Sequence, residues 1–511
     1  MTEDTRRRLY LAAVTTLVAL HAALALSAAA RIGVTIDEPI GMASGYALLT
    51  ERELRINVGQ PPVVKIVAAL PLLYLHPGFD PAQPSYQAGQ MWTFSRQFLF
   101  ETGANVPICV AASRAATLSF SVALALVLAA RARRSFGRGG ALIALALYAL
   151  DPTFLGHGPI VKFDVASALF IFLAVMGLRD ALDAGSAPRL ALAGFWAGLA
   201  MATKFSSILV FPVCVLLAAC ACWKEGARRG WLVRAAPGWI AGVALGIAIP
   251  YGIVLVPDFF HGLAWHRARM KLGYLSYFWG HTGKEGHWLY FPVAFVLKTP
   301  LPILAVTGLA VVCALRRPRD PVATGALLAA LLLFVPLLPS PANVGHRYLI
   351  PVYPFLYFVA GGLARDRLGR AAAVVAVALL AAGAAWSFPD YLGSTNLIAG
   401  SRPERYIADS NLDWGQDLPR LAEYLRGSGG GERVRLAYSG MDQPEQYGID
   451  YEPAPCHAEP GFYAASINVV KGILPPERPD CYRWLDAHDP VARVGTSMLV
   501  YRIPAEPAVA P

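Results

Sequence analysis

The chain has 511 residues, of which 56% are hydrophobic and 15% charged, and its mean hydropathy is +0.46. Soluble globular proteins carry fewer apolar and more charged residues, so this composition excludes them and predicts an integral membrane protein. The formal net charge of +10 does not indicate a nucleic-acid partner. The basic residues form short clusters between apolar runs, where membrane proteins have their cytoplasmic loops.

Residues 1–388 are expected to form a polytopic α-helical membrane domain. A spanning helix needs about 20 apolar residues, and about eleven runs approach or reach this length. The first run is too long for a cleavable signal peptide. The predicted spans are residues 9–30, 107–130, 139–156, 164–182, 188–203, 206–222, 233–256, 289–314, 322–339, 347–364 and 371–388.

The basic clusters predict how these spans are oriented. They follow alternate spans and therefore fall on one face, and Lys and Arg are enriched on the cytoplasmic side of membrane proteins. The N-terminus is thus expected to be cytoplasmic and the tail from residue 389 extracytoplasmic. The clusters lie at residues 6–8, 131–138, 179–189, 223–234, 316–320 and 365–370.

The apolar run at residues 61–75 is not counted as a span. It is short, begins with two prolines and contains Lys65. Counting it would also move the basic cluster at 131–138 to the outside. An interfacial or re-entrant helix within a first outer loop over residues 31–105 fits better.

Several polar residues are predicted to lie together on the outer face. Ionisable groups near the hydrocarbon edge are costly unless they are paired or hydrated, so their number at one level predicts a polar cavity that opens outward. The carboxylates of Asp37, Glu38 and Asp164 offer a general base. The cations of this set could hold an anion, and they are Lys65, Lys162, Lys204, Lys298, His346 and Arg347.

Each of these residues also has a purely structural interpretation. Lys162 and Lys204 could extend to the membrane interface as snorkelling side chains, and His346 could be a satisfied interfacial histidine. Asp164 could cap its helix or pair with Lys162. The aromatic segment at residues 274–291 is typical of an interfacial belt and loop core, and a sugar-stacking role is the alternative.

A general base beside a phosphate clamp in a membrane indicates group transfer from a lipid phosphate. The sequence contains no GxxxxGK[ST] motif, and the cytoplasmic loops are too short for a nucleotide site. The expected energy source is therefore an activated lipid-linked donor.

Several motifs together resemble the bacterial phospholipid carrier-dependent glycosyltransferases, relatives of the protein O-mannosyltransferases and aminoarabinose transferases of the GT-C superfamily. They are "DEP", "INVGQPPVVKIVAALPLL", "GHGPIVKFDVASALF", "GLAMATKFSSILVFP", "GHRYLIPVYPFLYFVAG" and "DSNLDWGQDLPRLAEYL", and the resemblance runs to about residue 425. It implies sugar transfer, with inversion, from a polyprenyl-phosphate donor to a protein, lipid or glycan acceptor. It also implies the outer face of a bacterial inner membrane.

The resemblance implies roles for individual residues. The family's acidic pair after the first helix corresponds to Asp37 and Glu38, and its acid at the start of the fourth helix to Asp164. Our hypothesis is that Asp37 is the general base and that Glu38 and Asp164 orient the acceptor and the base. Arg347, with Lys298 or Lys204, would stabilise the departing polyprenyl phosphate, because an arginine fork binds phosphate oxygens bidentately.

Two positions depart from the family pattern. Many relatives have a histidine two residues after the DEP proline and another before the double proline, where this chain has Gly41 and Gln60. A carboxylate pair alone is a poor zinc shell. No metal or other cofactor is therefore firmly implied. A divalent metal stays open as an alternative, which Gly41 and Gln60 weaken.

Residues 389–511 are polar and are expected to form a small extracytoplasmic α/β domain, with an amphipathic helix near 416–426 and a strand in "RVRLAYSG". The carboxylates of "DSNLDWGQD" could hold a cation, but the EF-hand spacing is absent and a structural turn is favoured. Cys456 and Cys481 are expected to form a disulfide in an oxidising compartment.

A polytopic transporter or lipid flippase is the main alternative. It predicts charges at the membrane midplane, broken helices and inverted repeats. The charges of this chain gather at one face and no repeat is detected, so the sequence favours the transferase. A non-catalytic scaffold would leave the outer-face acids unexplained.

Overall fold

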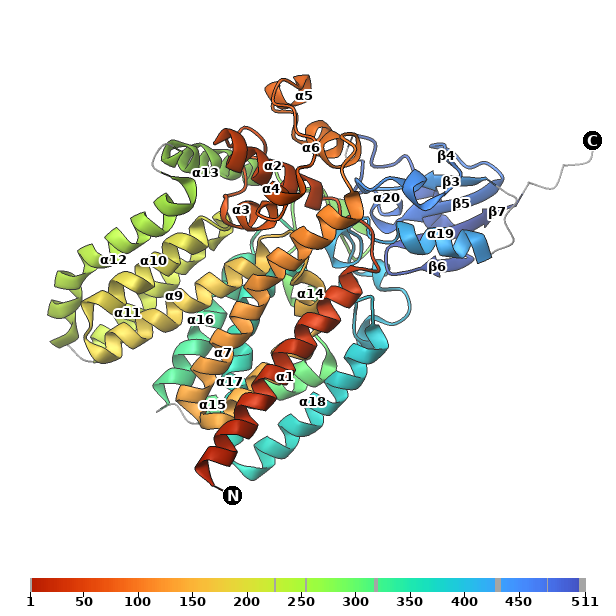
Figure 1. Ribbon diagram of the computed structural model, residues 1–511. Helices are drawn as coiled ribbons and strands as arrows, with labels where there is room; N and C mark the ends of the chain where they lie inside the picture. The colour runs from red at the N-terminus through yellow and green to blue at the C-terminus, as the bar shows by residue number, and fades with distance from the viewer. Residues whose placement is uncertain are drawn as a thin grey trace, which may run out of the picture.

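The computed structural model describes residues 2–224, 227–252, 255–316, 320–427, 433–475 and 477–504. Long helices form a bundle, and a small β-sheet lies beside the end of the bundle that is remote from the N-terminus (Figure 1). Helix α1 (Glu3–Ala29) runs from the N-terminal end towards the sheet, and the helices of the first outer loop lie at the same end as the sheet.

Among the described residues, six helical stretches are long and apolar enough to cross a membrane. This number confirms a multi-pass helical membrane protein, although it is smaller than the predicted number of spans. The six stretches are Glu3–Ala29, Val106–Leu150, Asp164–Ala184, Phe205–Trp223, Arg229–Tyr251 and Arg367–Ser387, which belong to α1, α7, α9, η1 with α11, α12 and α18.

Helix α7 (Val106–Leu150) joins the predicted span 107–130 to residues 139–150 of the next predicted span, and the remainder of that span falls in α8 (Pro152–His157) after a break at Asp151. The 45 residues of α7 would be about 67 Å long if straight, more than twice the hydrocarbon thickness of about 30 Å. The helix is broken at Gly137, whose φ of 74° is freely available to glycine alone. The expected boundary between two spans thus coincides with this break.

The prediction of one continuous helix over residues 289–314 is wrong. Helices α14 (Tyr290–Lys298) and α15 (Leu301–Leu315) are bent by 113° relative to each other. Pro300 lies between them, and it disfavours the helical conformation of Thr299, whose ψ is 126°. The predicted span 347–364 is helical throughout but divided into the 3-10 helix η3 (His346–Val352), α17 (Tyr353–Gly361) and the 3-10 helix η4 (Gly362–Arg365). Pro351 lies inside η3.

Other elements follow or extend the predictions. The run at 61–75 forms two short helices, α3 (Val63–Ala69) and α4 (Leu72–Leu75), too short to be a regular span. Helix α13 (Val256–Lys271) and the hairpin of β1 (Ser276–Phe278) and β2 (His281–Gly283) were not predicted. The remaining helices are α2 (Glu38–Glu51), α5 (Pro84–Gln87), α6 (Met91–Phe100), α8 (Pro152–His157), α10 (Ala187–Met201), α11 (Val210–Lys224), α12 (Ala227–Tyr251), α16 (Pro321–Phe334) and α20 (Ile467–Val470).

At the N-terminal end of the bundle, ion pairs join the predicted basic cluster at 131–138 to the start of α1 and to the cluster at 179–189, and the cluster at 365–370 to the one at 316–320. Their arginines form ion pairs with acids from other helices or loops, which would not be possible if the clusters lay on opposite faces. The assignment of this end to the cytoplasm stays a prediction. The ion pairs are Arg138–Glu3, Arg131–Asp180 and Arg365–Asp320.

The C-terminal sheet has the order β4-β3-β5-β7-β6. Strand β3 (Val434–Ala437) is parallel to β4 (Tyr451–Pro453) and to β5 (Gly461–Ser466). Strand β7 (Met498–Ile503) pairs antiparallel with β5 and with β6 (Ala492–Val494). Helix α19 (Leu418–Gly427) packs its apolar side against one face of this sheet. The predicted helix and strand are confirmed.

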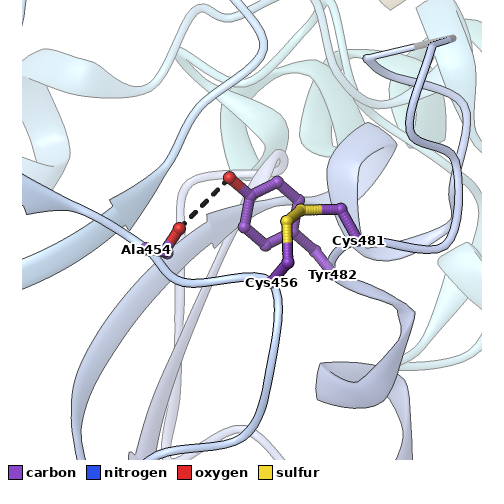
Figure 2. Close-up of a disulfide and its surroundings, with 4 residues drawn as sticks. All are labelled: Ala454, Cys456, Cys481 and Tyr482. Atoms are coloured by element: carbon purple, nitrogen blue, oxygen red, sulfur yellow. Dashed lines mark hydrogen bonds between the residues drawn. A yellow bond between two sulfur atoms is a disulfide. The ribbon is translucent and has the colours of Figure 1, made fainter.

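The predicted disulfide is present between Cys456 and Cys481 (Figure 2). It joins the loop after β4 to the segment before the 3-10 helix η9 (Arg483–Ala487). Beside it, the Tyr482 hydroxyl donates a hydrogen bond of 3.2 Å to the Ala454 carbonyl. Both contacts hold these irregular segments against the sheet.

Candidate active site

Asp37 stands between α1 and α2, at the start of a helix whose second residue is Pro39. Its side chain does not cap the helix. Instead it forms an ion pair with Lys162 and lies 3.8 Å from the Arg347 guanidinium. The carboxylate keeps 30% of its surface exposed. A reactive group needs this combination of positioning and access.

Glu38 has different surroundings, although it is the next residue. Its carboxylate is fully buried and forms a two-pronged ion pair with Arg114, with Nε–Oε1 and Nη2–Oε2 distances of 2.8 and 2.6 Å. The backbone N–H of Thr35 donates to it at 2.9 Å. The remaining Arg114 donors bind carbonyls of the α1–α2 connection, including Ala29 and Gly33. This pair therefore fixes the backbone that carries Asp37.

Asp164 is the first residue of α9 and pairs with Lys204, with an Oδ1–Nζ distance of 2.5 Å. The predicted alternatives were a helix cap or a pair with Lys162. Neither is found, because Lys162 is engaged with Asp37. The Lys204 ammonium also lies 4.1 Å from the centre of the Tyr348 ring. Both members of this second ion pair are buried.

Asp37 and Arg347 open into a cavity of about 190 Å³. Trp414 forms part of its wall and stacks under two cations, since the Lys162 ammonium lies 4.3 Å and the Arg347 guanidinium carbon 4.8 Å from its ring centre. Other polar groups on the wall are Arg269, Tyr274, Asp409, Ser410, Asp413, Ser439 and Asn468. The cavity thus joins the membrane helices to the C-terminal region.

The segment "DSNLDWGQD" has the predicted structural turn. The Asp413 carboxylate accepts hydrogen bonds from the backbone N–H groups of Gly415 and Asn468, at 2.9 and 3.0 Å. The Asn411 side chain donates to the Tyr290 hydroxyl and accepts from the His346 N–H, both at 2.8 Å. The turn therefore ties the C-terminal region to α14 and η3, and forms one side of the cavity.

Burial changes the acidity of two carboxyls of this turn. It raises the pKa of Asp413 to about 7. It also raises the pKa of Asp409, against the opposing effect of the nearby Arg347 guanidinium. Both groups line the cavity, so its charge changes within the physiological pH range.

Of the six predicted binding residues, only Arg347 lines this cavity. Lys162 and Lys204 form the ion pairs described above, and the other three bind uncharged groups. The ammonium groups of Lys65 and Lys298 donate to backbone carbonyls, at 2.5 Å to Asn57 and 2.5 Å to Asn411. His346 is 2.6 Å from the Tyr353 hydroxyl through its Nε2. Their proposed contacts with substrate stay predictions, and each holds a neighbouring segment in place.

The sequence analysis missed several residues of the site. Arg114 is a lone arginine in the apolar run 107–130, and an ionisable residue within a span is itself a functional signal. Trp414 lay in a motif that we interpreted only as a turn. Arg269 lies in α13, which was not predicted. Tyr274 begins the aromatic segment 274–291, which we interpreted as an interfacial belt and loop core.

The structure also bears on the two departures from the family pattern. A β-carbon at Gly41 would lie 2.7 Å from Cγ1 of Val161, so a histidine does not fit there without displacing Val161. Within the described ranges, no three His, Cys, Asp or Glu residues are grouped so that they could hold a metal ion.

Comparisons with known proteins agree with the resemblance. The family model of dolichyl-phosphate-mannose-protein mannosyltransferase matches residues 111–253. The crystal structure of ArnT from Cupriavidus metallidurans in the apo state is similar, with 14% identity, a TM-score of 0.54 and coverage of 95% of this chain and 97% of that chain. The same protein bound to undecaprenyl phosphate gives 14% identity, a TM-score of 0.52 and coverage of 98% of each chain. None of the curated proteins matches the chain in sequence.

Proposed function

We propose that this membrane protein, which has the GT-C fold of the ArnT structures and a segment of the mannosyltransferase family, transfers a sugar from a polyprenyl-phosphate donor to an acceptor. The observation that carries the proposal is the half-open Asp37 carboxylate in a cavity beside Lys162 and Arg347. The binding of undecaprenyl phosphate by the similar ArnT supports a lipid-linked donor. The outer face of the membrane is the proposed location of this cavity.

The transfer is an in-line displacement at the anomeric carbon. The acceptor hydroxyl oxygen forms a bond to C1 as the bond from C1 to the phosphate oxygen breaks, which inverts the configuration. Asp37 takes the hydroxyl proton, and the electron pair leaves with the polyprenyl phosphate. Arg347 and Lys162 stabilise the negative charge that develops on this phosphate, since charge-assisted hydrogen bonds strengthen as charge builds up.

The ion pairs of Asp37 give this reaction an order. A carboxylate held by two cations is a weak base, because protonation would sacrifice both attractions. The donor phosphate competes with Asp37 for Lys162 and Arg347. Donor binding would therefore release Asp37 to accept the proton, and a donor-first sequence is expected.

Glu38 and Asp164 are assigned positioning roles in this proposal. Glu38 acts through Arg114 on the backbone before Asp37. Asp164 holds Lys204 beside Tyr348 and next to the Arg347 segment. Neither carboxylate is needed as a second base.

The test is turnover of purified protein in lipid nanodiscs with a panel of polyprenyl-phosphate sugars, measured as release of polyprenyl phosphate. Asp37→Asn should lower turnover about 10²–10⁴-fold, the usual contribution of a general base, while donor binding persists. Asp450→Asn is the matched control, because this carboxylate is 82% exposed on the C-terminal domain. Full turnover in Asp37→Asn would exclude Asp37 as the base. An absence of binding and turnover with every donor would contradict the transferase and favour a transporter.

A further inference from the structure

A second cavity, of about 530 Å³, is lined by residues of the β1–β2 hairpin, whereas the cavity at Asp37 is lined by Tyr274 and Leu275 just before it. The two cavities have no lining residue in common, but residues two apart in the chain line them. Leu275 and Ile473 line the cavity at Asp37, and Tyr277 and Lys471 line the second one. We call this second cavity the hairpin groove. Its wall residues are Tyr277, Trp279, Gly280, Arg402, Glu404, Arg405, Tyr406, Lys471, Asp486, Ala487, His488 and Asp489.

Trp279 lies at the groove with an exposed side chain and a strained backbone conformation. Its side chain is 62% exposed, and its φ of 49° is rare for a bulky residue. The Trp279 N–H donates to the Tyr406 carbonyl at 2.9 Å, and the two rings meet edge to face at 5.2 Å. Backbone strain of this kind clusters at sites that bind ligands. The groove thus presents a rigid aromatic platform.

The charges of the hairpin groove are balanced. Arg402, Arg405 and Lys471 face the same number of acids, Glu404, Asp486 and Asp489. Arg402 pairs with Asp489 at 2.8 Å and Lys471 with Asp486 at 2.6 Å. A surface for phosphate or an anionic lipid headgroup would carry an excess of positive charge. This groove offers many donors and acceptors and favours a neutral, hydroxyl-rich ligand.

We propose that the hairpin groove binds a saccharide, and that this saccharide is the part of a glycan acceptor beyond the sugar unit that receives the transfer. The apolar C–H face of a pyranose ring stacks on Trp279, and its hydroxyls bind the charged side chains, which both donate and accept hydrogen bonds. Because residues two apart in the chain line the two cavities, the proposal places the outer sugars of the acceptor in the groove while the receiving sugar lies at Asp37. The acceptor role rests on the proposed function, whereas saccharide binding does not.

Binding is tested first, in the absence of turnover. The Asp37→Asn protein in nanodiscs is titrated with mannotetraose, chitotetraose and maltotetraose by saturation-transfer NMR. At least one tetrasaccharide should bind saturably, and Trp279→Ala should weaken it at least tenfold. Trp288→Ala is the matched control, because Trp288 is 63% exposed but does not line the groove. No saturable binding, or equal losses in both tryptophan variants, would overturn the proposal.

Transfer is tested second, in the wild-type background with the donor that turns over. Trp279→Ala should raise the KM for the bound tetrasaccharide at least tenfold and leave donor hydrolysis by water unchanged. If no donor turns over but Trp279→Ala still abolishes tetrasaccharide binding, the proposed function fails and the saccharide site stands. If Trp279→Ala changes only the dependence of the protein on phosphatidylglycerol in the nanodisc, Trp279 is a membrane anchor and the saccharide site is overturned.

Discussion

Asp37 and Glu38 are adjacent in the sequence and lie in opposite environments. Glu38 is fully buried and satisfied by Arg114 and by backbone N–H groups. Asp37 is 30% exposed, and its ion-pair partners in the described residues are Lys162 and Arg347, of which Arg347 lines the same cavity as Asp37. A carboxylate whose hydrogen-bonding capacity is used by the protein serves the structure. One whose partners can be drawn away by a ligand is free to do chemistry.

The start of a helix creates this difference. Consecutive residues on an α-helix point about 100° apart, so two neighbouring acids at the start of α2 face different surroundings. One side of the connection packs on α7, which supplies Arg114, and the other faces the loop before α9, which supplies Lys162. The comparison predicts that the two acids fail in different ways when they are changed.

The largest expected effect is that replacing Asp37 by Asn lowers mainly the turnover, whereas replacing Glu38 by Gln lowers mainly the stability. Asp37→Asn should lower kcat about 10²–10⁴-fold and change the melting temperature less than Glu38→Gln does, because the Asp37 side chain is 30% exposed and that of Glu38 is fully buried. Glu38→Gln should lower the melting temperature and reduce kcat far less. Turnover assays paired with thermal unfolding of the same preparations measure both. Similar losses of kcat in both variants would contradict the assignment of a catalytic role to Asp37 and a structural role to Glu38.

The next effect concerns the partner of Glu38. Arg114→Met leaves a buried carboxylate without its cation, which costs about 3–5 kcal/mol of stability for pairs of this kind. The double variant Arg114→Met/Glu38→Gln removes both charges and should recover part of this loss. Unfolding in detergent monitors the cycle. Wild-type stability of Arg114→Met would show that the pair does not hold the α1–α2 connection.

A smaller effect is expected on the other side of the comparison. Arg347→Ala removes a charge-assisted contact worth about 1.5–3 kcal/mol, which corresponds to a loss of donor affinity of about 10–100-fold. Equilibrium binding of polyprenyl-phosphate sugar in the Asp37→Asn background measures this loss. Lys65→Met is the control, because the Lys65 ammonium binds the Asn57 carbonyl and should affect stability instead. Unchanged donor affinity in Arg347→Ala would contradict the clamp.

Local sequence signals were sufficient for much of the fold. Apolar length located α1, α9 and α18 to within a few residues, and the amphipathic pattern located α19. The break between α14 and α15 was missed because an apolar average does not register the conformation that Pro300 imposes on its neighbour. The β1–β2 hairpin was missed because its short strands are stabilised by contacts with Tyr406 and Ile407, distant in the sequence.

The site shows the same limit. The sequence grouped Asp37, Lys162 and Arg347 on one face, and the structure brings these three together. The sequence could not distinguish the two cations, Lys162 and Arg347, from Lys65 and Lys298, because all four are basic residues near an apolar run. In the structure, Lys162 and Arg347 contact the Asp37 carboxylate, whereas Lys65 and Lys298 bind backbone carbonyls. Tertiary packing decides which partner each cation has.

The smallest expected effect is a pH dependence of donor affinity, which tests whether an acid of the cavity weakens binding of the anionic donor near Arg347. Burial raises the pKa of Asp413 to about 7, so this cavity residue is neutral below that pH and negatively charged above it. The donor is a phosphodiester whose charge is constant between about pH 6 and 8, so its affinity should fall a few-fold as pH rises across this range. Asp413→Asn, assayed in the Asp37→Asn background, should flatten the profile and keep the affinity found at low pH. A profile that remains steep in Asp413→Asn would assign the pH dependence to another group and remove Asp413 from the electrostatics of donor binding.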